Sequence, residues 1–578
     1  MFGALKFGAR QSNEVYMAGT ILTVNAIWNK FSVPDTVGAE VVAEKKVGGV
    51  LLSSLAIEGR RVKDETVEIF GILARGVQST ISPAIFLVNE FDYGIDESLI
   101  IDLVKRGFTV LAIDLAGKRE DAERYTVYPE SLSHAEYSNA KDDLFKIKGD
   151  VIGTCWYEWT AAAKYALKYL KSLPFVTKVG GLGIGKAATA VWQIIGTEES
   201  LDCAVFVRNA GWAGYRGIEK FGGMVEPQFS DDLYKYIAGV EPQTYAMHAK
   251  CPALVLCATN DNENDVDRAY DTVSKIKEDI YTAVNYSVGY KDCISVDAYK
   301  NAILFFNRFL LEGNTEKLPK DTEIKLDIVD GKADIEVIPY ADNLKSVAVY
   351  VAQEITKSSL RSWQKITDYE KDGESYKFTF NPFGQSGIVM AFAVSTYKNG
   401  FSIGTNVVAK RFNETEVISQ RKNNILYSSR IKNSESVFTA ANPLELSPKN
   451  VCINDKEIVK VKKGPMGMEG LTCCRGLLTF KVGTECCKPI DGSMLMLDVY
   501  SKERATLEVK LISDYFGNKI EYLTRVDILG GDVWHNVQME INRFKTAEGM
   551  PLKSYKKITA AEITVIGSDD LINNALWV

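Results

Sequence analysis

Short apolar runs alternate with amphipathic stretches over the first half of the chain, from about Val67 to Gly313. The apolar runs predict strands, because runs of four to eight such residues are typical of strands buried on both faces of a sheet. They span residues 67–74, 84–90, 108–117, 176–183, 203–209, 252–260 and 281–288. Apolar residues spaced three and four apart predict helices over 97–106, 156–172, 186–195, 263–276 and 297–311. Together they predict an α/β domain over 61–318, with a mostly parallel sheet and helices on both faces.

The pattern changes after Leu318-Pro319, where apolar and polar residues begin to alternate with period two. Runs such as KLDIVDGKADIEVI and YKFTFNPF predict an immunoglobulin-like β-sandwich over 319–412. Later runs such as MLMLDVY and ATLEVKLIS predict a second all-β region over 413–578, long enough for a jelly roll. Residues 1–60 are expected to add strands that pack on the α/β domain.

Composition narrows the classes of function. The 578 residues include 68 Lys and Arg against 75 Asp and Glu, a net charge of −7, which argues against a protein built mainly to bind nucleic acid. No stretch approaches the roughly 18 apolar residues of a membrane helix, and the N-terminus lacks a secretory signal pattern. We therefore expect a cytoplasmic protein without a membrane or nucleic-acid partner. No motif indicates a cofactor, and none is expected.

Ten cysteines and three histidines limit the available chemistry. Five cysteines are scattered, and five crowd together at Cys452, Cys473, Cys474, Cys486 and Cys487. Structural zinc sites usually leave two to four residues between paired ligands, and adjacent residues on a strand point to opposite faces. We therefore expect free thiols and no metal site, with the role of the cluster open. Any histidine-dependent mechanism must use His134, His248 or His535.

A glycine-rich segment, KVGGLGIGKAATA at residues 178–190, joins a predicted strand to a predicted helix. In the pattern Gly-x-Ser-x-Gly, such a turn holds a nucleophile above the sheet, and the next backbone N–H helps to form an oxyanion hole. In the frame from Gly181 to Gly185 the nucleophile position is Gly183, which has no side chain. Asp261 can supply the acid after a later strand, but the loop expected to carry the histidine, 289–295, has Tyr290 and no histidine. The triad thus lacks its nucleophile and its base.

Residues from about 60 to 315 resemble an α/β-hydrolase of the acetyl xylan esterase and dienelactone hydrolase-like group. The matching stretches are VEIFGILARG, PAIFLVNEFDYG, KRGFTVLAIDLAGK, CWYEWTAAAKYALKYLKSLPFV, VGGLGIG and CPALVLCATNDNEND. The segment VYVAQEITKSSLRSWQKI is similar to the immunoglobulin-like module that follows some of these esterases, and the C-terminal end is similar to a jelly-roll carbohydrate-binding module.

The resemblance implies roles for individual residues. It places the nucleophile at Gly183, the acid at Asp261 and the histidine within 289–295. The oxyanion hole would consist of the Ile184 N–H and the N–H of Glu90 or Phe91. Two tryptophans near the predicted strand ends, Trp156 and Trp212, would line a ligand pocket or belong to the core.

Three other interpretations of these segments stay open. Gly180, Gly185 and Lys186 match most of a phosphate-binding loop, but Ala187 replaces its Ser or Thr. The glycines can also serve only a sharp bend and close packing of helix on sheet. The acidic run from Asp261 to Asp267 departs from the EF-hand pattern, and it either caps the next helix or holds a cation.

The sequence thus predicts a catalytically degenerate, esterase-like protein that binds a small ligand, such as a carbohydrate or acylated sugar, at the strand ends. One alternative is an active carboxylic ester hydrolase of acetyl-sugar esterase type, with a non-standard nucleophile or water and Asp261 as general base. Another is a purely structural protein whose domains serve assembly. An open pocket would favour the first two hypotheses, and a pocket filled by its own side chains would favour the third. The oligomeric state is left open.

Overall fold

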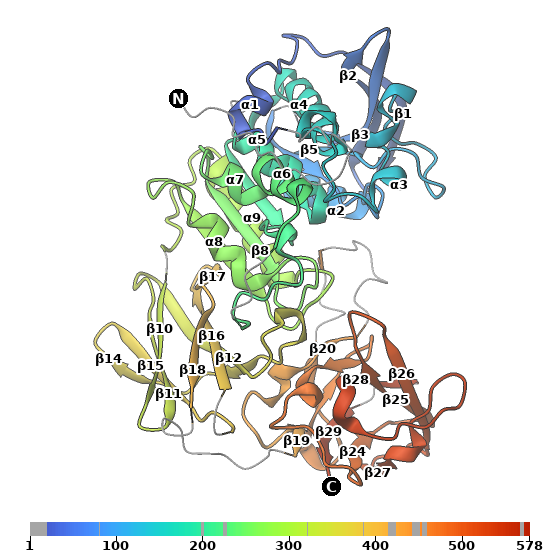
Figure 1. Cartoon of the computed structure of the whole chain (residues 1–578), viewed down its shortest axis with the longest axis vertical. Helices are drawn as coiled ribbons and strands as arrows, with labels where there is room; N and C mark the ends of the chain where they lie inside the picture. Colours follow the sequence, from blue (N-terminus) through green and yellow to red (C-terminus); the bar gives the residue numbers. More distant parts are fainter. Residues whose placement is uncertain are drawn as a thin grey trace, which may run out of the picture.

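The computed structural model has an α/β region at one end and two regions of sheet at the other (Figure 1). It describes residues 20–79, 81–197, 201–223, 228–320, 322–384, 387–413, 424–441, 451–453, 459–566 and 571–578. Within this part of the chain, no helix is long and apolar enough to cross a membrane.

A nine-stranded sheet, in the order β1-β2-β3-β5-β4-β6-β7-β8-β9, forms the centre of the first region. Its strands are β1 (Ala39–Val47), β2 (Val50–Val62), β3 (Glu65–Gly76), β4 (Ser82–Val88), β5 (Thr109–Ile113), β6 (Val176–Ile184), β7 (Cys203–Val207), β8 (Ala253–Ala258) and β9 (Thr282–Ser287). The strands β4, β5, β6, β7, β8 and β9 are mutually parallel, whereas β1, β2 and β3 form an antiparallel extension. The predicted α/β class is confirmed, and the expected N-terminal strands belong to the same sheet.

Helices cover both faces of this sheet because both faces are apolar. On one face α2 (Glu97–Lys105) and α9 (Val296–Leu310) contribute to one hydrophobic core. On the other, α4 (Cys155–Ser172) and α5 (Ala188–Ile195) contribute to a second. The remaining described helices are α1 (Val24–Trp28), α3 (Tyr137–Ala140), α6 (Asp231–Gly239), α7 (Pro242–Ala246) and α8 (Ala269–Val273).

The helix predicted over 263–276 is wrong in extent, because only α8 and a preceding 3-10 turn at Val266–Arg268 form. The Asp261 carboxylate accepts the backbone N–H groups of Glu263 and Asn264, and Asp265 accepts that of Asp267. Asp side chains that bond to nearby backbone compete with the helix in this way.

Two regions of antiparallel sheet follow, as the period-two pattern predicted. In the second region the sheets are β10-β11-β15-β14 and β13-β12-β16-β17, with β18 paired to β16, and a hydrophobic core lies between them. Its strands are β10 (Glu323–Val329), β11 (Lys332–Ile338), β12 (Leu344–Gln353), β13 (Gln364–Ile366), β14 (Glu370–Asp372), β15 (Ser375–Phe380), β16 (Gly387–Tyr397), β17 (Ser402–Gly404) and β18 (Val408–Phe412).

The third region also has two sheets around one core, in the orders β21-β22-β29-β24-β27, with β19 on β29, and β20-β23-β28-β25-β26. Its strands are β19 (Ile425–Ser428), β20 (Thr439–Ala440), β21 (Lys460–Lys463), β22 (Glu469–Thr472), β23 (Leu477–Thr479), β24 (Met494–Tyr500), β25 (Ala505–Ser513), β26 (Ile520–Ile528), β27 (His535–Glu540), β28 (Ile558–Ile566) and β29 (Leu571–Trp577). The immunoglobulin-like and jelly-roll assignments stay predictions.

A buried ion pair joins the first region to the second. The guanidinium of Arg361, only 1% exposed, donates to both carboxylate oxygens of Asp267 and to the carbonyls of Ile355 and Thr356. Close by, the Asn260 amide donates to the carbonyls of Ser359 and Arg361, at 3.0 and 2.8 Å. These polar bonds fix the second region against the end of β8.

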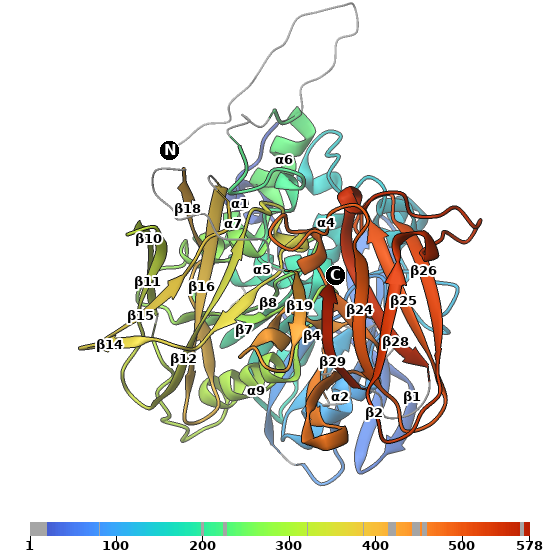
Figure 2. The same cartoon turned by 90° about the horizontal axis from the view of Figure 1, so that it is seen from below.

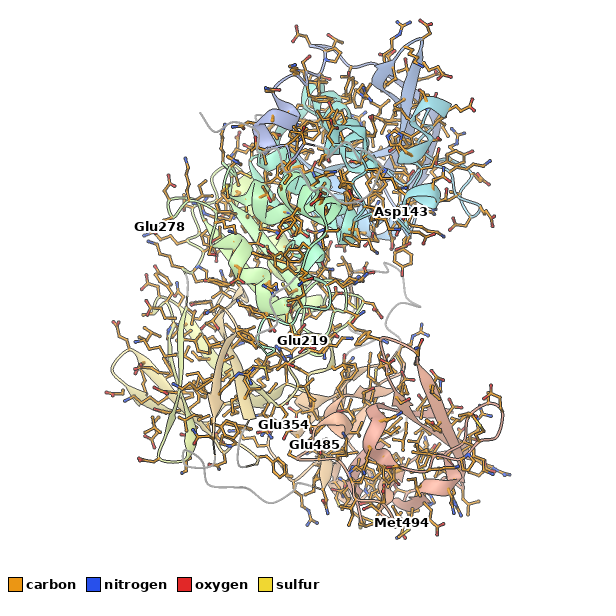
Figure 3. The ribbon with its side chains drawn as sticks, in the orientation of Figure 1. Asp143, Glu219, Glu278, Glu354, Glu485 and Met494 are labelled. Atoms are coloured by element: carbon orange, nitrogen blue, oxygen red, sulfur yellow. The ribbon has the colours of Figure 1, made fainter. Side chains whose placement is uncertain are left out.

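Side chains labelled in Figure 3 lie at this boundary and at the boundary between the second and third regions. Glu219, from the α/β region, accepts a hydrogen bond from Thr356 of the second region. Glu354 of the second region accepts the backbone N–H of Glu485 of the third at 2.6 Å. Polar contacts with specific partners therefore cross both boundaries.

We predict that Arg361→Ala lowers the free energy of unfolding by about 3–5 kcal/mol, because it leaves the Asp267 charge buried without its partner. Urea denaturation measures the change. Arg504→Ala is the matched control, since Arg504 pairs with Asp527 on the surface and should contribute no more than about 1 kcal/mol. Replacing Arg361 and Asp267 together by apolar residues should cost less than Arg361→Ala alone, and an equal or larger loss would contradict this interpretation.

Candidate functional site

The glycine-rich turn bends at Gly185. Strand β6 continues through Gly183, which pairs with Val88 and Phe206, and ends at Ile184. Gly185 then adopts a φ of +58°, in the left-handed region that favours glycine, and begins a 3-10 turn that leads into α5. The turn therefore begins two residues after Gly183, the predicted nucleophile position.

Gly183 itself serves packing. A Cβ at this position would stand 2.7 Å from the Cα of Ala188, at the start of α5. A side chain would therefore force α5 away from the sheet. Gly183 thus allows close packing of helix on sheet, one of the roles considered for these glycines.

The carboxylate of Glu90 occupies the space beside this turn. Glu90 follows β4 and is 5% exposed. Its Oε2 accepts the backbone N–H of Lys186 at 2.9 Å, and its Oε1 accepts the N–H of Phe91 at 2.9 Å. A Cβ at Gly185 would overlap Glu90 Oε2. The carboxylate therefore stands where a side chain of residue 185 would begin, and it uses the two N–H groups that border this space.

Of the residues expected to form an oxyanion hole, Phe91 donates its N–H to the Glu90 carboxylate, as does Lys186, the residue after Gly185. Ile184, predicted for that role, is instead part of β6 and pairs with Val207. The Phe91 ring packs against Tyr137 and Trp159 and belongs to the core.

Arg208 binds Asp261, the residue predicted as the acid of a triad. It follows β7, adopts a φ of +53° and is 8% exposed. Its Nε donates to Asp261 Oδ2 at 2.7 Å, and its Nη1 donates to the carbonyl of Asp292 at 2.6 Å. The other carboxylate oxygen of Asp261 accepts the N–H groups of Glu263 and Asn264. Asp261 thus lies at the predicted strand end, but it is fully engaged by an arginine and by backbone.

Charges of both signs compensate one another around Glu90. Burial raises the pKa of the Glu90 carboxyl, and the charges of Lys186 and Arg208 oppose that rise. The Lys186 ammonium also pairs with Glu263 at 2.9 Å and with Asp92 at 3.4 Å. Although burial acts in the opposite direction, this pairing lowers the pKa of Glu263. Paired side chains thus form a network at the strand ends, and two of its acids, Asp261 and Glu263, also line an open cleft.

Two other predicted site residues lie away from this network. Trp156 is 4% exposed, and its indole N–H donates to the Leu144 carbonyl at 2.9 Å, which places it in the core. The carbonyl of Tyr290 accepts the Asn260 N–H at 2.9 Å, and its side chain packs beside the buried Cys293 and Cys452.

Trp212 borders a cleft of about 330 Å³ between the first and second regions. The cleft is also lined by Tyr215, Glu263 and residues 356–359. Trp212 has a φ of +63°, which is unusual for a bulky side chain and marks a strained position. Its indole N–H donates to Thr272 at 2.8 Å, and the cations of Arg268 and Lys275 lie 5.5 and 5.8 Å from its ring centroid.

Glu241 stabilises the strained backbone at Trp212. Its carboxylate is buried and accepts the N–H of Trp212 at 2.7 Å, the N–H of Gly214 and the side-chain amide of Gln243. All three donors are uncharged, so desolvation dominates and raises the pKa of Glu241 to about 7.

Sequence reasoning missed Lys186 as an N–H donor, and it missed Arg208 and Glu241. A signal existed for Arg208, because a charged residue directly follows the apolar run CAVFV.

The cysteines Cys473 and Cys486 are partly buried, Cys474 is exposed and Cys487 is buried. Across the described ranges, no three His, Cys, Asp or Glu residues come together as a metal site.

Comparisons with known proteins find similar solved structures only. No protein-family model matches the chain, and no curated protein matches it. Among solved structures, an acetyl xylan esterase from Paenibacillus sp. R4 matches with a TM-score of 0.36 and 12% identity, over 50% of this chain and 92% of its own. Acetyl xylan esterase 1 from Thermoanaerobacterium sp. JW/SL YS485 matches with a TM-score of 0.33 and 14% identity, over 47% and 90%.

A third similar structure is an acylaminoacyl peptidase from Pyrococcus horikoshii, with a TM-score of 0.32 and 11% identity, over 49% of this chain and 57% of its own. The acetyl xylan esterases match about half of this chain. At these scores the likeness assigns no activity to it.

The raised pKa of Glu241 predicts a pH dependence. The unfolded chain ionises this group near pH 4.5, so between pH 4.5 and about 7 the folded protein retains the proton more often. The contribution of Glu241 to the free energy of unfolding therefore falls as pH rises through this window, by about 3 kcal/mol in total. Glu241→Gln should remove this slope, although the loss of an acceptor lowers stability at every pH.

Urea denaturation of wild type and Glu241→Gln, from about pH 5 to about pH 8, measures the difference. Glu278→Gln, a change at another acid, is the control and should keep the wild-type slope. Parallel curves for wild type and Glu241→Gln would contradict the prediction.

Proposed function

We propose that the chain is a non-hydrolytic protein of the α/β-hydrolase type, related in design to the acetyl xylan esterase-like group but with a degenerate triad. One observation carries this proposal: the Glu90 carboxylate accepts the two N–H groups next to Gly185, a residue without a side chain. Hydrolysis of an ester by this design needs a free hole for the oxyanion and a nucleophile beside it. In this chain the Glu90 carboxylate occupies the proposed hole.

The alternative of an active ester hydrolase with Asp261 as general base receives less support. A general base must reach the proton that it removes. Both Asp261 oxygens already accept hydrogen bonds, from Arg208 on one side and from backbone N–H groups on the other. Protonated Arg208 cannot act as a base, since it keeps its proton at all relevant pH values.

The network of paired side chains at the strand ends favours the structural hypothesis, because its contacts reach from one region to another. The network ties together the ends of β4, β6, β7 and β8, and Arg208 extends it to the loop 289–295. In that loop the Lys291 ammonium donates to the Tyr515 hydroxyl of the third region. We therefore propose that the α/β region is a scaffold that holds two β-sandwiches, immunoglobulin-like and jelly-roll in type, in a fixed arrangement.

Ligand binding is the second candidate, and the cleft at Trp212 is the observation that favours it. The cleft combines two aromatic rings with hydroxyl and carboxylate groups. Such a mixture suits a polar ligand with an apolar face, as a sugar has. Asp261 lines this cleft too, so the candidate keeps the ligand beside the strand ends, at the boundary with the second region.

We predict that the purified protein does not hydrolyse short-chain aryl or acetyl-sugar esters above the background rate. Asp261→Ala and Glu90→Ala should leave this rate unchanged, because neither residue acts on an ester. Asp143→Ala, a change at a surface acid (Figure 3), is the matched control. Enzyme-like turnover in wild type that Asp261→Ala reduces by roughly a hundredfold would overturn the proposal.

A second prediction tests the geometry of the hole directly. Glu90→Ala leaves the N–H groups of Phe91 and Lys186 without their acceptor, which should destabilise the protein by about 1–3 kcal/mol, while Arg208 keeps Asp261. Acetate should then bind in the vacated space and raise the thermal midpoint of the variant but not of wild type. At ten times its Kd, the gain in the free energy of unfolding is about 1.4 kcal/mol.

Chloride at equal ionic strength is the control for a salt effect. If acetate and chloride act equally on Glu90→Ala, the N–H groups do not form a carboxylate site, and the assignment of the hole fails.

A further inference from the structure

The first strand of the nine-stranded sheet has an open edge. Among the described residues, β1 pairs with β2 alone, and both views show the β1–β2 hairpin at a margin of the molecule (Figures 1 and 2). Every residue of β1 after Ala39 is exposed, and the valines Val41 and Val47 are 54% and 41% exposed. An edge of this length offers a row of backbone N–H and C=O groups to another strand.

The opposite end of the same sheet differs. There β9 packs against the second region, where the Asn285 amide donates to the Ser402 carbonyl at 3.1 Å and the Tyr286 hydroxyl donates to the Thr405 carbonyl at 2.6 Å. The second region thus covers this edge, and β1 remains as the accessible edge of the sheet in the described part of the chain.

The sequence of β1, AEVVAEKKV, orders its charges so that it complements itself. In an antiparallel pair of two copies centred on Ala43, Glu40 of each copy lies opposite Lys46 of the other. The same register places Val41 opposite Lys45 and brings no like charges together. A parallel pair in register would instead place each charge opposite its own kind, which is destabilising.

The two charged residues that would pair in this register, Glu40 and Lys46, are accessible to a second copy. Glu40 and Lys46 are exposed and form no ion pair with other described residues, whereas Lys45 pairs with Glu97 at 2.7 Å. Another edge strand shows the opposite design: β21 reads Lys-Val-Lys-Lys, so two copies would bring lysines together. Lysines of this kind protect an edge from pairing.

We propose that β1 is the contact of a symmetric homodimer, in which two copies pair antiparallel along this edge and their sheets become continuous. The occupant is a second copy because the charge order of β1 matches its own reverse, as a two-fold interface requires. Pairing satisfies the backbone groups of the edge and buries the exposed valines. The interface is independent of the proposed function, since none of its residues contacts the network around Glu90.

Sedimentation equilibrium over roughly a hundredfold range of protein concentration tests this proposal. Wild type should dimerise reversibly. Glu40→Lys and Lys46→Glu should each raise the Kd of the dimer by roughly tenfold, since each brings like charges into both symmetric pairs. The double variant Glu40→Lys/Lys46→Glu restores opposite charges and should return to the wild-type Kd.

Lys462→Glu, on the edge strand β21, is the matched control and should leave the Kd unchanged. All three positions are exposed on edge strands, and circular dichroism checks that each variant is folded. A wild type that stays monomeric throughout would overturn the proposal and would mean that the β-bulge between Val41 and Ala43 protects this edge. Failure of the double variant to restore dimerisation would exclude the antiparallel register.

Discussion

The burial of one carboxyl group, that of Glu90, determines how the strand ends are built. A buried charge is tolerated only when it is hydrogen-bonded and paired. Two backbone N–H groups bind the carboxylate, and the cations of Lys186 and Arg208 lie close enough to oppose the effect of burial on its pKa. Each cation then needs further acids: Arg208 binds Asp261, and Lys186 binds Asp92 and Glu263. The network of ion pairs thus follows from the burial of the Glu90 carboxyl.

The same reasoning explains how the three regions are held together. Arg208 also binds the carbonyl of Asp292, and the neighbouring Lys291 reaches Tyr515 in the third region. The second region is fixed separately, by the buried pair of Arg361 and Asp267. Removing one member of such a pair costs several kcal/mol, because the other member stays buried. Directional polar bonds thus set the positions of the regions, and apolar packing within each region supplies most of the stability.

Much of the fold could be predicted from the sequence, because strand burial and strand alternation leave periodic signals. The run 108–117 contains β5, and the period-two runs became the sheets of the second and third regions. The turn was located only to within two residues, since three alternating glycines fit the same pattern and φ is not visible in a sequence. The partnership of Arg208 with Asp261 was missed because it joins residues 53 positions apart. The helix predicted over 263–276 begins inside the acidic run 261–267, whose own side chains bind the backbone that a helix needs.

The contact between Gly185 and Glu90 has a consequence for how this sequence can change. Any side chain at position 185 meets the Glu90 carboxylate, so substitutions at the two positions are epistatic. A larger residue at 185 becomes acceptable only after residue 90 has been shortened, whereas the reverse order passes through a steric overlap. The order of mutations is therefore constrained, and a lineage that carries both Gly185 and Glu90 gains a side chain at this turn only along a path that first gives up the buried carboxylate.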